Sequence, residues 1–184
     1  KGRHRLLTVD ATMTMPTGLK QSSSVVPIGF ALPESAANTF TQGSVDLNLS
    51  PLDREVFVVL AINLDNDFPE GIAGVDTQVR SSLTTTSQAS IPNLGNSNCM
   101  ARTTNAVKSA GFVDAGVSFT QQSTETPPST LEYIGIIATN DFFIQVQGTG
   151  NTLPHGVAGK LYGYRARADA SIYAALVQSE VLSA

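Results

Sequence analysis

The sequence is poor in the side chains that carry chemistry. Its 184 residues include one cysteine, Cys99, two histidines, His4 and His155, and no tryptophan. A single cysteine excludes an internal disulfide framework, and it leaves the cellular compartment open. Two histidines and one cysteine are too few for a typical zinc site. We therefore expect no cofactor and no metal-dependent or histidine-based catalysis.

Charged residues and long apolar runs are also scarce. Only 14% of the residues are charged, compared with roughly 25% in ordinary soluble domains. The longest uninterrupted apolar run, residues 56–62 (VFVVLAI), is far shorter than the roughly 20 residues that a membrane-spanning helix needs. We therefore expect no transmembrane segment. A surface rich in hydroxyl groups suits contacts with further copies of the chain, or hydrogen bonds to sugars.

Positive charge is concentrated at the start of the chain. Lys1, Arg3 and Arg5 supply three of the eleven positive charges, and because the whole chain has a net charge of −4, the remaining residues carry −7. This asymmetry predicts a basic arm, residues 1–5, that contacts phosphate groups or an acidic neighbour. Residues 6–184 are expected to form a single β-sandwich domain.

The body of the chain has the pattern of an all-β protein. Short apolar or alternating runs are separated by Gly, Pro, Asn and Asp, which favours a two-sheet antiparallel sandwich, jelly-roll-like, with seven or eight strands. The expected strands are 7–15, 45–49 and 56–62 around a turn at 51–53, 113–119, a hairpin of 133–138 and 142–147 around a turn at 139–141, and 157–167. Residues 77–105 have apolar residues too sparse for either period, and are expected to form loops with one or two edge strands.

The end of the chain predicts a helix at about 170–182. Asp169 or Ser171 suits the N-cap position, and alanine-rich helix formers follow. A terminal helix of about three turns needs packing to persist, either on its own body or on a neighbouring subunit. Tyr173, Leu176 and Glu180 are candidate subunit contacts.

Two weaker patterns are candidate sites. Asp65, Asp67 and Glu70 lie in an oxygen-rich segment with carboxylates at alternate positions, which suits calcium, but Phe68 occupies the position where an EF-hand needs glycine. The alternative is a turn after a buried strand. Cys99 with His155 is a formal nucleophile pair, although a lone cysteine is usually a small buried apolar side chain.

Several features together resemble the small viral coat proteins with a jelly-roll fold. These are the basic arm (KGRHR), the amphipathic segment directly after it (LLTVDATMTM), the punctuated strands and the sparsely charged surface. The resemblance implies an arm that faces nucleic acid or a membrane, sheets that form a shell, and a loop at 120–130 placed at contacts or on the outer surface.

The sequence thus favours a non-enzymatic structural protein that assembles with copies of itself, as a virion shell subunit, with or without other coat proteins. Its arm would add a weak nucleic-acid contact that many copies strengthen. Two alternatives remain open. One is a carbohydrate-binding or adhesive sandwich located outside the cell or at the cell surface, and the other is a filament subunit that donates residues 7–15 to its neighbour.

Overall fold

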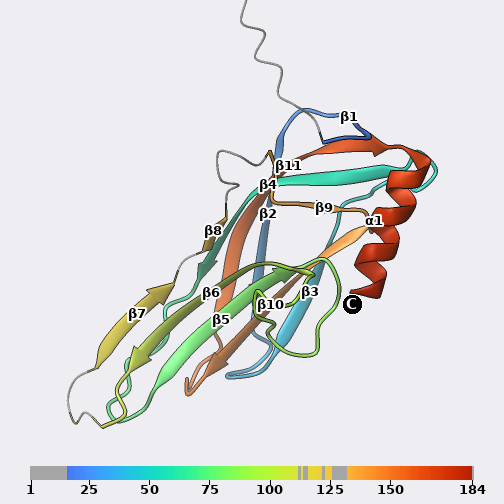
Figure 1. Ribbon diagram of the computed structural model, residues 1–184. Helices are drawn as coiled ribbons and strands as arrows, with labels where there is room; N and C mark the ends of the chain where they lie inside the picture. Colours follow the sequence, from blue (N-terminus) through green and yellow to red (C-terminus); the bar gives the residue numbers. More distant parts are fainter. Residues whose placement is uncertain (1–15, 112, 114–115, 122, 126–131, 184) are drawn as a thin grey trace, which may run out of the picture.

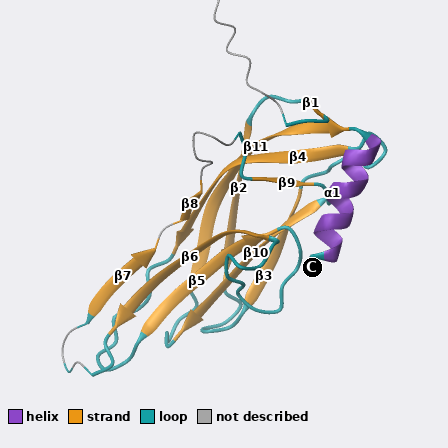
Figure 2. Ribbon diagram, in the orientation of Figure 1, coloured by secondary structure: helices purple, strands orange, loops and turns teal. Residues whose placement is uncertain are grey.

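The chain folds into a β-sandwich with a helix at its end. The computed structural model describes residues 16–111, 113, 116–121, 123–125 and 132–183. Within these ranges there are two antiparallel sheets, which we call sheet A and sheet B, and one helix, α1 (Ala170–Leu182). Figure 1 and Figure 2 show the helix against the outside of the sandwich, at one end. The predicted fold class and the C-terminal helix are confirmed.

The strands divide between the sheets as follows. In sheet A, one edge of β11 (Gly156–Ala168) pairs with β1 (Leu19–Gln21) and β2 (Val26–Pro33). The other edge of β11 pairs with β4 (Glu55–Asn66). On its far side, β4 pairs with β8 (Ser123–Glu125) and β9 (Gly135–Ile137). Sheet B has the order β3 (Thr41–Asp46), β10 (Asp141–Thr149), β5 (Thr77–Thr84), β6 (Cys99–Lys108) and β7 (Val117–Gln121).

The pairing identifies the sandwich as a jelly roll. Strands from the two halves of the chain pair in nested order: β2 with β11, β3 with β10, β4 with β8 and β9, and β5 with β6. The chain therefore behaves as one long hairpin, with its tip between β5 and β6, that is wound into two sheets. The described residues contain eleven strands, more than the expected seven or eight. The excess arises because β1, β7, β8 and β9 are pieces of three to five residues that flank or extend the longer strands.

The main core lies between the two sheets. Phe57, Val59, Ile62 and Leu64 of β4 all belong to it, although the first two have odd numbers and the last two have even numbers. A strand exposes alternate residues on opposite faces. The change of parity arises from a bulge, because the pairing with β11 passes from Ala61 to Val59 and leaves Leu60 without a partner.

Helix α1 covers the outer face of sheet A. Ile172 and Leu176 pack on a second buried cluster that contains Val56, Val58 and Ala166. This explains the apolar run at 56–62: Val56 and Val58 face the helix, whereas alternate residues face the main core. Such an apolar run is typical of a strand buried on both faces, and residues 56–59 are completely buried. Asp169 occupies the N-cap position, as expected, but its side chain makes no capping hydrogen bond.

Two predicted strand pairs are wrong, because the connecting segments cross between the sheets. The segments around the turn at 139–141 belong to β9 in sheet A and β10 in sheet B. Asn140 anchors this crossing by accepting the N–H of Leu49 at 2.8 Å and donating to Asp46 at 2.7 Å. Likewise, the strands on either side of the turn at 51–53 are β3 in sheet B and β4 in sheet A.

The prediction that residues 77–105 form loops with one or two edge strands is also wrong. Most of this range forms β5 and β6, which are interior strands of sheet B, and only residues 85–98 connect them. The alternation of apolar and polar residues does not reveal these strands, because hydroxyl and amide side chains occupy buried positions where apolar side chains are usual. The buried side chain of Gln145 on β10 accepts from Ser82 at 2.6 Å and donates to Thr84 at 2.8 Å.

Other expected segments are placed only in part. The strand expected at 113–119 begins at Val117, and residues 7–15 lie outside the described residues. The loop expected at 120–130 is partly strand, because β7 extends to Gln121 and β8 spans Ser123–Glu125. Among the described residues, no helix has the length and apolar character required to cross a bilayer.

Candidate assembly site

Four connecting loops meet at one end of the sandwich, which we call the four-loop end. They are residues 34–40, 67–76, the described part of 109–116, and 150–155, and they lie toward the lower left of the sandwich in Figure 1. Their meeting follows from the topology, since each connects a strand that ends there to one that begins there. Asn38 and Asn151 join the first and last of these loops by two hydrogen bonds, of 2.7 and 2.9 Å.

A buried carboxylate organises the centre of this end. Glu34 is 5% exposed, and it accepts the backbone N–H groups of Thr39 at 3.0 Å, Gly148 at 2.8 Å and His155 at 2.9 Å. Three charge-assisted hydrogen bonds compensate for the loss of solvation of the carboxylate. Glu34 therefore fixes the 34–40 loop against the segment around residue 150.

A second carboxylate holds the 67–76 loop to the 150–155 loop. Glu70 accepts the backbone N–H and the hydroxyl of Thr152, at 2.8 and 2.7 Å, and the backbone N–H of Leu153 at 2.8 Å. The ring of His155 lies 3.3 Å from the Glu70 carboxylate. The backbone and hydroxyl donors of Thr152, followed by Leu153 and His155, lower the pKa of Glu70 from 4.5 to about 2. The carboxylate is therefore ionised at neutral pH and serves as an anchor.

The third anchor joins the loops after β4 and β6. Asp76 accepts the N–H groups of Ser109 at 2.8 Å and Ala110 at 2.9 Å. These two bonds lower the pKa of Asp76, and the bond from Ala110 has the larger effect. Lys108 lies 3.6 Å from the same carboxylate in an exposed ion pair. Because surface ion pairs contribute little, the backbone bonds dominate the anchoring.

Two of the three residues considered for calcium are engaged in contacts within the fold. Asp67 accepts the N–H of Gly156 at 2.8 Å, Glu70 is engaged as described, and Asp65 is exposed on β4. Among the residues that the structure describes, no three His, Cys, Asp or Glu side chains gather closely enough to hold a metal ion. These contacts are those of a turn after a buried strand, and the calcium site stays a prediction.

The four-loop end presents apolar side chains to the solvent. Phe68 is 52% exposed, Leu153 is 62% exposed, and Val75 and Val113 are exposed in the neighbouring loops. The Glu70 carboxylate holds the 67–76 loop, which carries Phe68, to the 150–155 loop, which carries Leu153. A preorganised apolar surface of this kind loses less entropy on association than a mobile one.

The residues proposed as a nucleophile pair lie apart. His155 belongs to the four-loop end, whereas Cys99 begins β6, whose last residue, Lys108, reaches that end. A strand rises roughly 3.3 Å per residue, so the length of β6 separates Cys99 from the four-loop end. Cys99 is buried. The fold therefore does not bring Cys99 and His155 together.

The candidate contacts on the C-terminal helix are turned toward their own subunit. Tyr173 and Leu176 pack on the outer cluster of sheet A. Glu180 is 7% exposed and accepts the N–H groups of Ala138 at 3.1 Å and Thr139 at 2.9 Å. In this structure the helix packs on its own body. The use of these residues between subunits remains a prediction.

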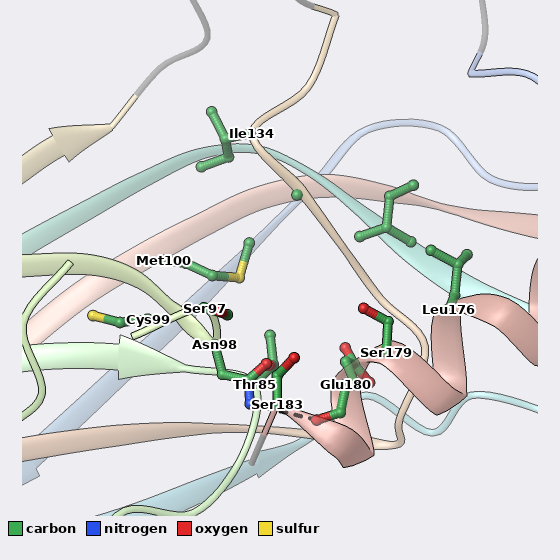
Figure 3. Close-up of a pocket in the computed structure, with 12 residues that line it drawn as sticks. Thr85, Ser97, Asn98, Cys99, Met100, Ile134, Leu176, Ser179, Glu180 and Ser183 are labelled. Carbon is green, nitrogen blue, oxygen red and sulfur yellow. Dashed lines mark hydrogen bonds between the residues drawn. The ribbon is translucent and has the colours of Figure 1, made fainter. Parts of the chain in front are cut away.

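A cavity of about 300 Å³ lies beside the last turns of this helix. Figure 3 shows Leu176, Ser179 and Glu180 on the helix side of the cavity, with Met100 and Ile134 across from them. Asn98 donates to the carbonyl oxygen of Glu180 at 3.4 Å. The lining combines the helix anchor Glu180 with polar side chains such as Thr85 and Asn98.

Lys1, Arg3 and Arg5 lie outside the described residues, so the arm remains a prediction. The sequence analysis did not predict that Glu34 and Asp76 anchor the loops. The available signal was indirect: in a chain with few charges, single carboxylates at strand ends are candidates for bonds to backbone N–H groups.

Comparison with known proteins gives a likeness of architecture. No family model matches the chain, and no curated protein sequence matches it. Among solved structures, Desmodium yellow mottle tymovirus aligns with a TM-score of 0.28 and 12% identity, over 86% of this chain and 97% of that one. A turnip yellow mosaic virus structure aligns with a TM-score of 0.28 and 12% identity, over 78% of this chain and 94% of that one. This likeness to viral structures is weak.

Proposed function

We propose that the chain is a structural subunit of a virion shell, which acts by repeated contacts with copies of itself and performs no catalysis. The observation that carries this proposal is the rigid four-loop end with its exposed Phe68 and Leu153. A sandwich with an exposed apolar tip suits packing around a symmetry axis, where identical tips meet.

The low charge of the chain supports the same reading. Subunit contacts bury surface, and burying an unpaired charge is costly. Hydroxyl and amide side chains carry a smaller penalty, and 14% charged residues leave few charges to bury. Weak contacts of this composition become collectively strong when closed symmetry repeats them. In this proposal Lys1, Arg3 and Arg5 contact the packaged nucleic acid or a neighbouring subunit.

The proposal is tested by removing the apolar tip. We expect Phe68→Ser with Leu153→Ser to abolish particle formation and leave a folded monomer. Burying a large apolar side chain is worth about 1.5–3 kcal/mol. Since 52% of Phe68 and 62% of Leu153 is exposed in the subunit, about half of that gain remains available to a contact. Together the two side chains contribute about 2–3 kcal/mol, a roughly 30- to 150-fold change in each contact's association constant.

Leu52→Ser is the matched control. Leu52 is 96% exposed, but it lies between β3 and β4, at the opposite end of the sandwich. Particle size is measured by light scattering after size exclusion and by electron microscopy, over a range of salt and protein concentrations. A wild-type chain that remains monomeric throughout contradicts assembly. Equal effects of the tip and control variants contradict the role of the four-loop end.

A further inference from the structure

Two arginines lie next to each other on the outer face of sheet B. Arg80 on β5 pairs with Thr104 on β6, and Ser82 pairs with Arg102, so the arginines are diagonal neighbours across the two strands. Such positions are about 7–8 Å apart at their Cα atoms. Both point away from the core, because the residues next to them in sequence, such as Val79, are completely buried between the sheets.

Neither arginine has a carboxylate partner among the described residues. The ion pairs there involve Lys108, His155 and Arg165. The Nη2 atom of Arg80 lies 3.5 Å from the amide oxygen of Gln147, which is a long contact. The Nε atoms of both arginines are buried and have no hydrogen-bond partner. Two adjacent guanidinium groups thus keep unused donors.

The adjacency of these cations has an energetic cost. Burial and, secondarily, the charge of Arg102 lower the pKa of Arg80, although an arginine stays protonated at neutral pH. Like charges that lack counterions destabilise a fold, and buried donors without partners cost free energy. The sheet retains both features at the same place, and an anion bound to the guanidinium groups would relieve the repulsion between their charges.

The neighbouring side chains suit an oxyanion. Gln147, Arg80 and Thr104 form one row across β10, β5 and β6, with Gln78 two residues before Arg80 on the same face. The neutral side chains of Gln147, Thr104 and Gln78 are all able to donate hydrogen bonds. The carboxylate of Asp76, at the end of the face, is already engaged with backbone N–H groups. Paired guanidinium groups with neutral donors match the geometry of a phosphate, which accepts bidentate bonds.

We propose that Arg80 and Arg102 together bind a phosphate group on the outer face of sheet B. The group is either inorganic phosphate or a phosphodiester of a single-stranded nucleic acid. This site is formed by residues other than those of the basic arm and the four-loop end, and the proposal does not depend on assembly.

The test compares the full-length chain with Arg80→Gln/Arg102→Gln and with a matched control, Arg167→Gln. Arg167 is exposed on β11 of sheet A, so the control removes a positive charge from a different sheet. Binding of inorganic phosphate is measured by calorimetry and by the shift in melting temperature, against chloride at equal ionic strength. We expect saturable binding to the wild type and to Arg167→Gln, and at least a tenfold loss in the double variant.

Arg80→Lys/Arg102→Lys keeps both charges and guards against misfolding of the glutamine variant. We expect it to bind phosphate about tenfold more weakly than the wild type, because lysine cannot form the bidentate fork. Circular dichroism verifies that each variant is folded. Equal phosphate affinity in the wild type and the lysine variant contradicts a site formed by two guanidinium groups.

A labelled single-stranded 12-mer identifies the source of the phosphate. Loss of two phosphate contacts reduces the slope of log affinity against log salt by about 1.4. If the oligonucleotide slope falls in the glutamine variant but not in Arg167→Gln, the source is a nucleic acid. If only inorganic phosphate distinguishes the variants, the source is the free anion. The proposal is overturned if neither ligand does so.

Discussion

Replacing Glu180 by alanine removes the carboxylate that attaches the last turn of α1 to the body. Two backbone N–H groups, those of Ala138 and Thr139, then lose acceptors at 3.1 and 2.9 Å. Ala138 is only 5% exposed, so water replaces the lost acceptor poorly. Each unsatisfied buried donor costs about 1–3 kcal/mol. Burial of the carboxylate itself offsets part of this, and we expect a net destabilisation of about 2–4 kcal/mol.

The direction of the pKa adds a second signature. Burial raises the pKa of Glu180 above its ordinary value of 4.5, against the opposing effect of its hydrogen bonds. The folded state therefore holds this proton more tightly than the unfolded state does. The contribution of Glu180 to stability is greatest below pH 4.5 and declines as the pH rises through the raised value. Glu180→Gln removes this pH dependence.

Urea unfolding of the dissociated subunit measures both effects, with amide exchange at Ala138 and Thr139 as a local probe. Gln178→Ala is the matched control, because Gln178 is exposed on the same helix, and it should change the free energy of unfolding by less than about 0.5 kcal/mol. The reasoning is refuted if Glu180→Ala also stays within that limit, or if the two amides keep their protection.

Three further predictions concern the anchors and the sheets. Because the pKa of Glu70 falls from 4.5 to about 2, the stability lost in Glu70→Gln should be full above pH 4.5 and should vanish as the pH falls to 2, which melting curves across this range would show. In Gly163→Ala the new Cβ would clash with the backbone oxygen of Val58, whereas Gly29 has open space around it. By urea unfolding we expect a loss of about 3 kcal/mol for Gly163→Ala and no loss beyond about 1 kcal/mol for Gly29→Ala. Gln145→Leu leaves the buried hydroxyl of Ser82 without its acceptor and should cost about 2–4 kcal/mol, of which Ser82→Ala in the same chain should recover part; no recovery would contradict a pairwise bond.

Local patterns predicted the elements better than their partners. The strand at 157–167 and the helix at 170–182 are present because their periodicity is strong and largely local. The hairpin expected at 133–147 failed, although its turn residues were favourable. Turn chemistry specifies where a chain reverses or bends, but it does not specify whether the next strand joins the same sheet.

The candidate site was visible in the sequence only in fragments. Asp67, Glu70 and His155 were noticed, but as a metal segment and a catalytic residue, because residue type indicates what a group is able to bind. Glu70 bonds residues more than 80 positions away. The partners of Glu70 are therefore set by the packing of loops that are distant in the sequence, and the periodicity of the sequence gives no information on such packing.

The sequence by itself determined the β class, the apolar strand buried on both faces, the terminal helix and the scarcity of reactive groups. These properties follow from alternation, propensity and composition, which act over a few residues. The tertiary structure alone decided the nested strand order, the packing of the helix on sheet A and the neighbours of Glu34, Glu70 and Arg80. Those depend on contacts between residues far apart in the chain, where the burial of sheet faces selects the arrangement.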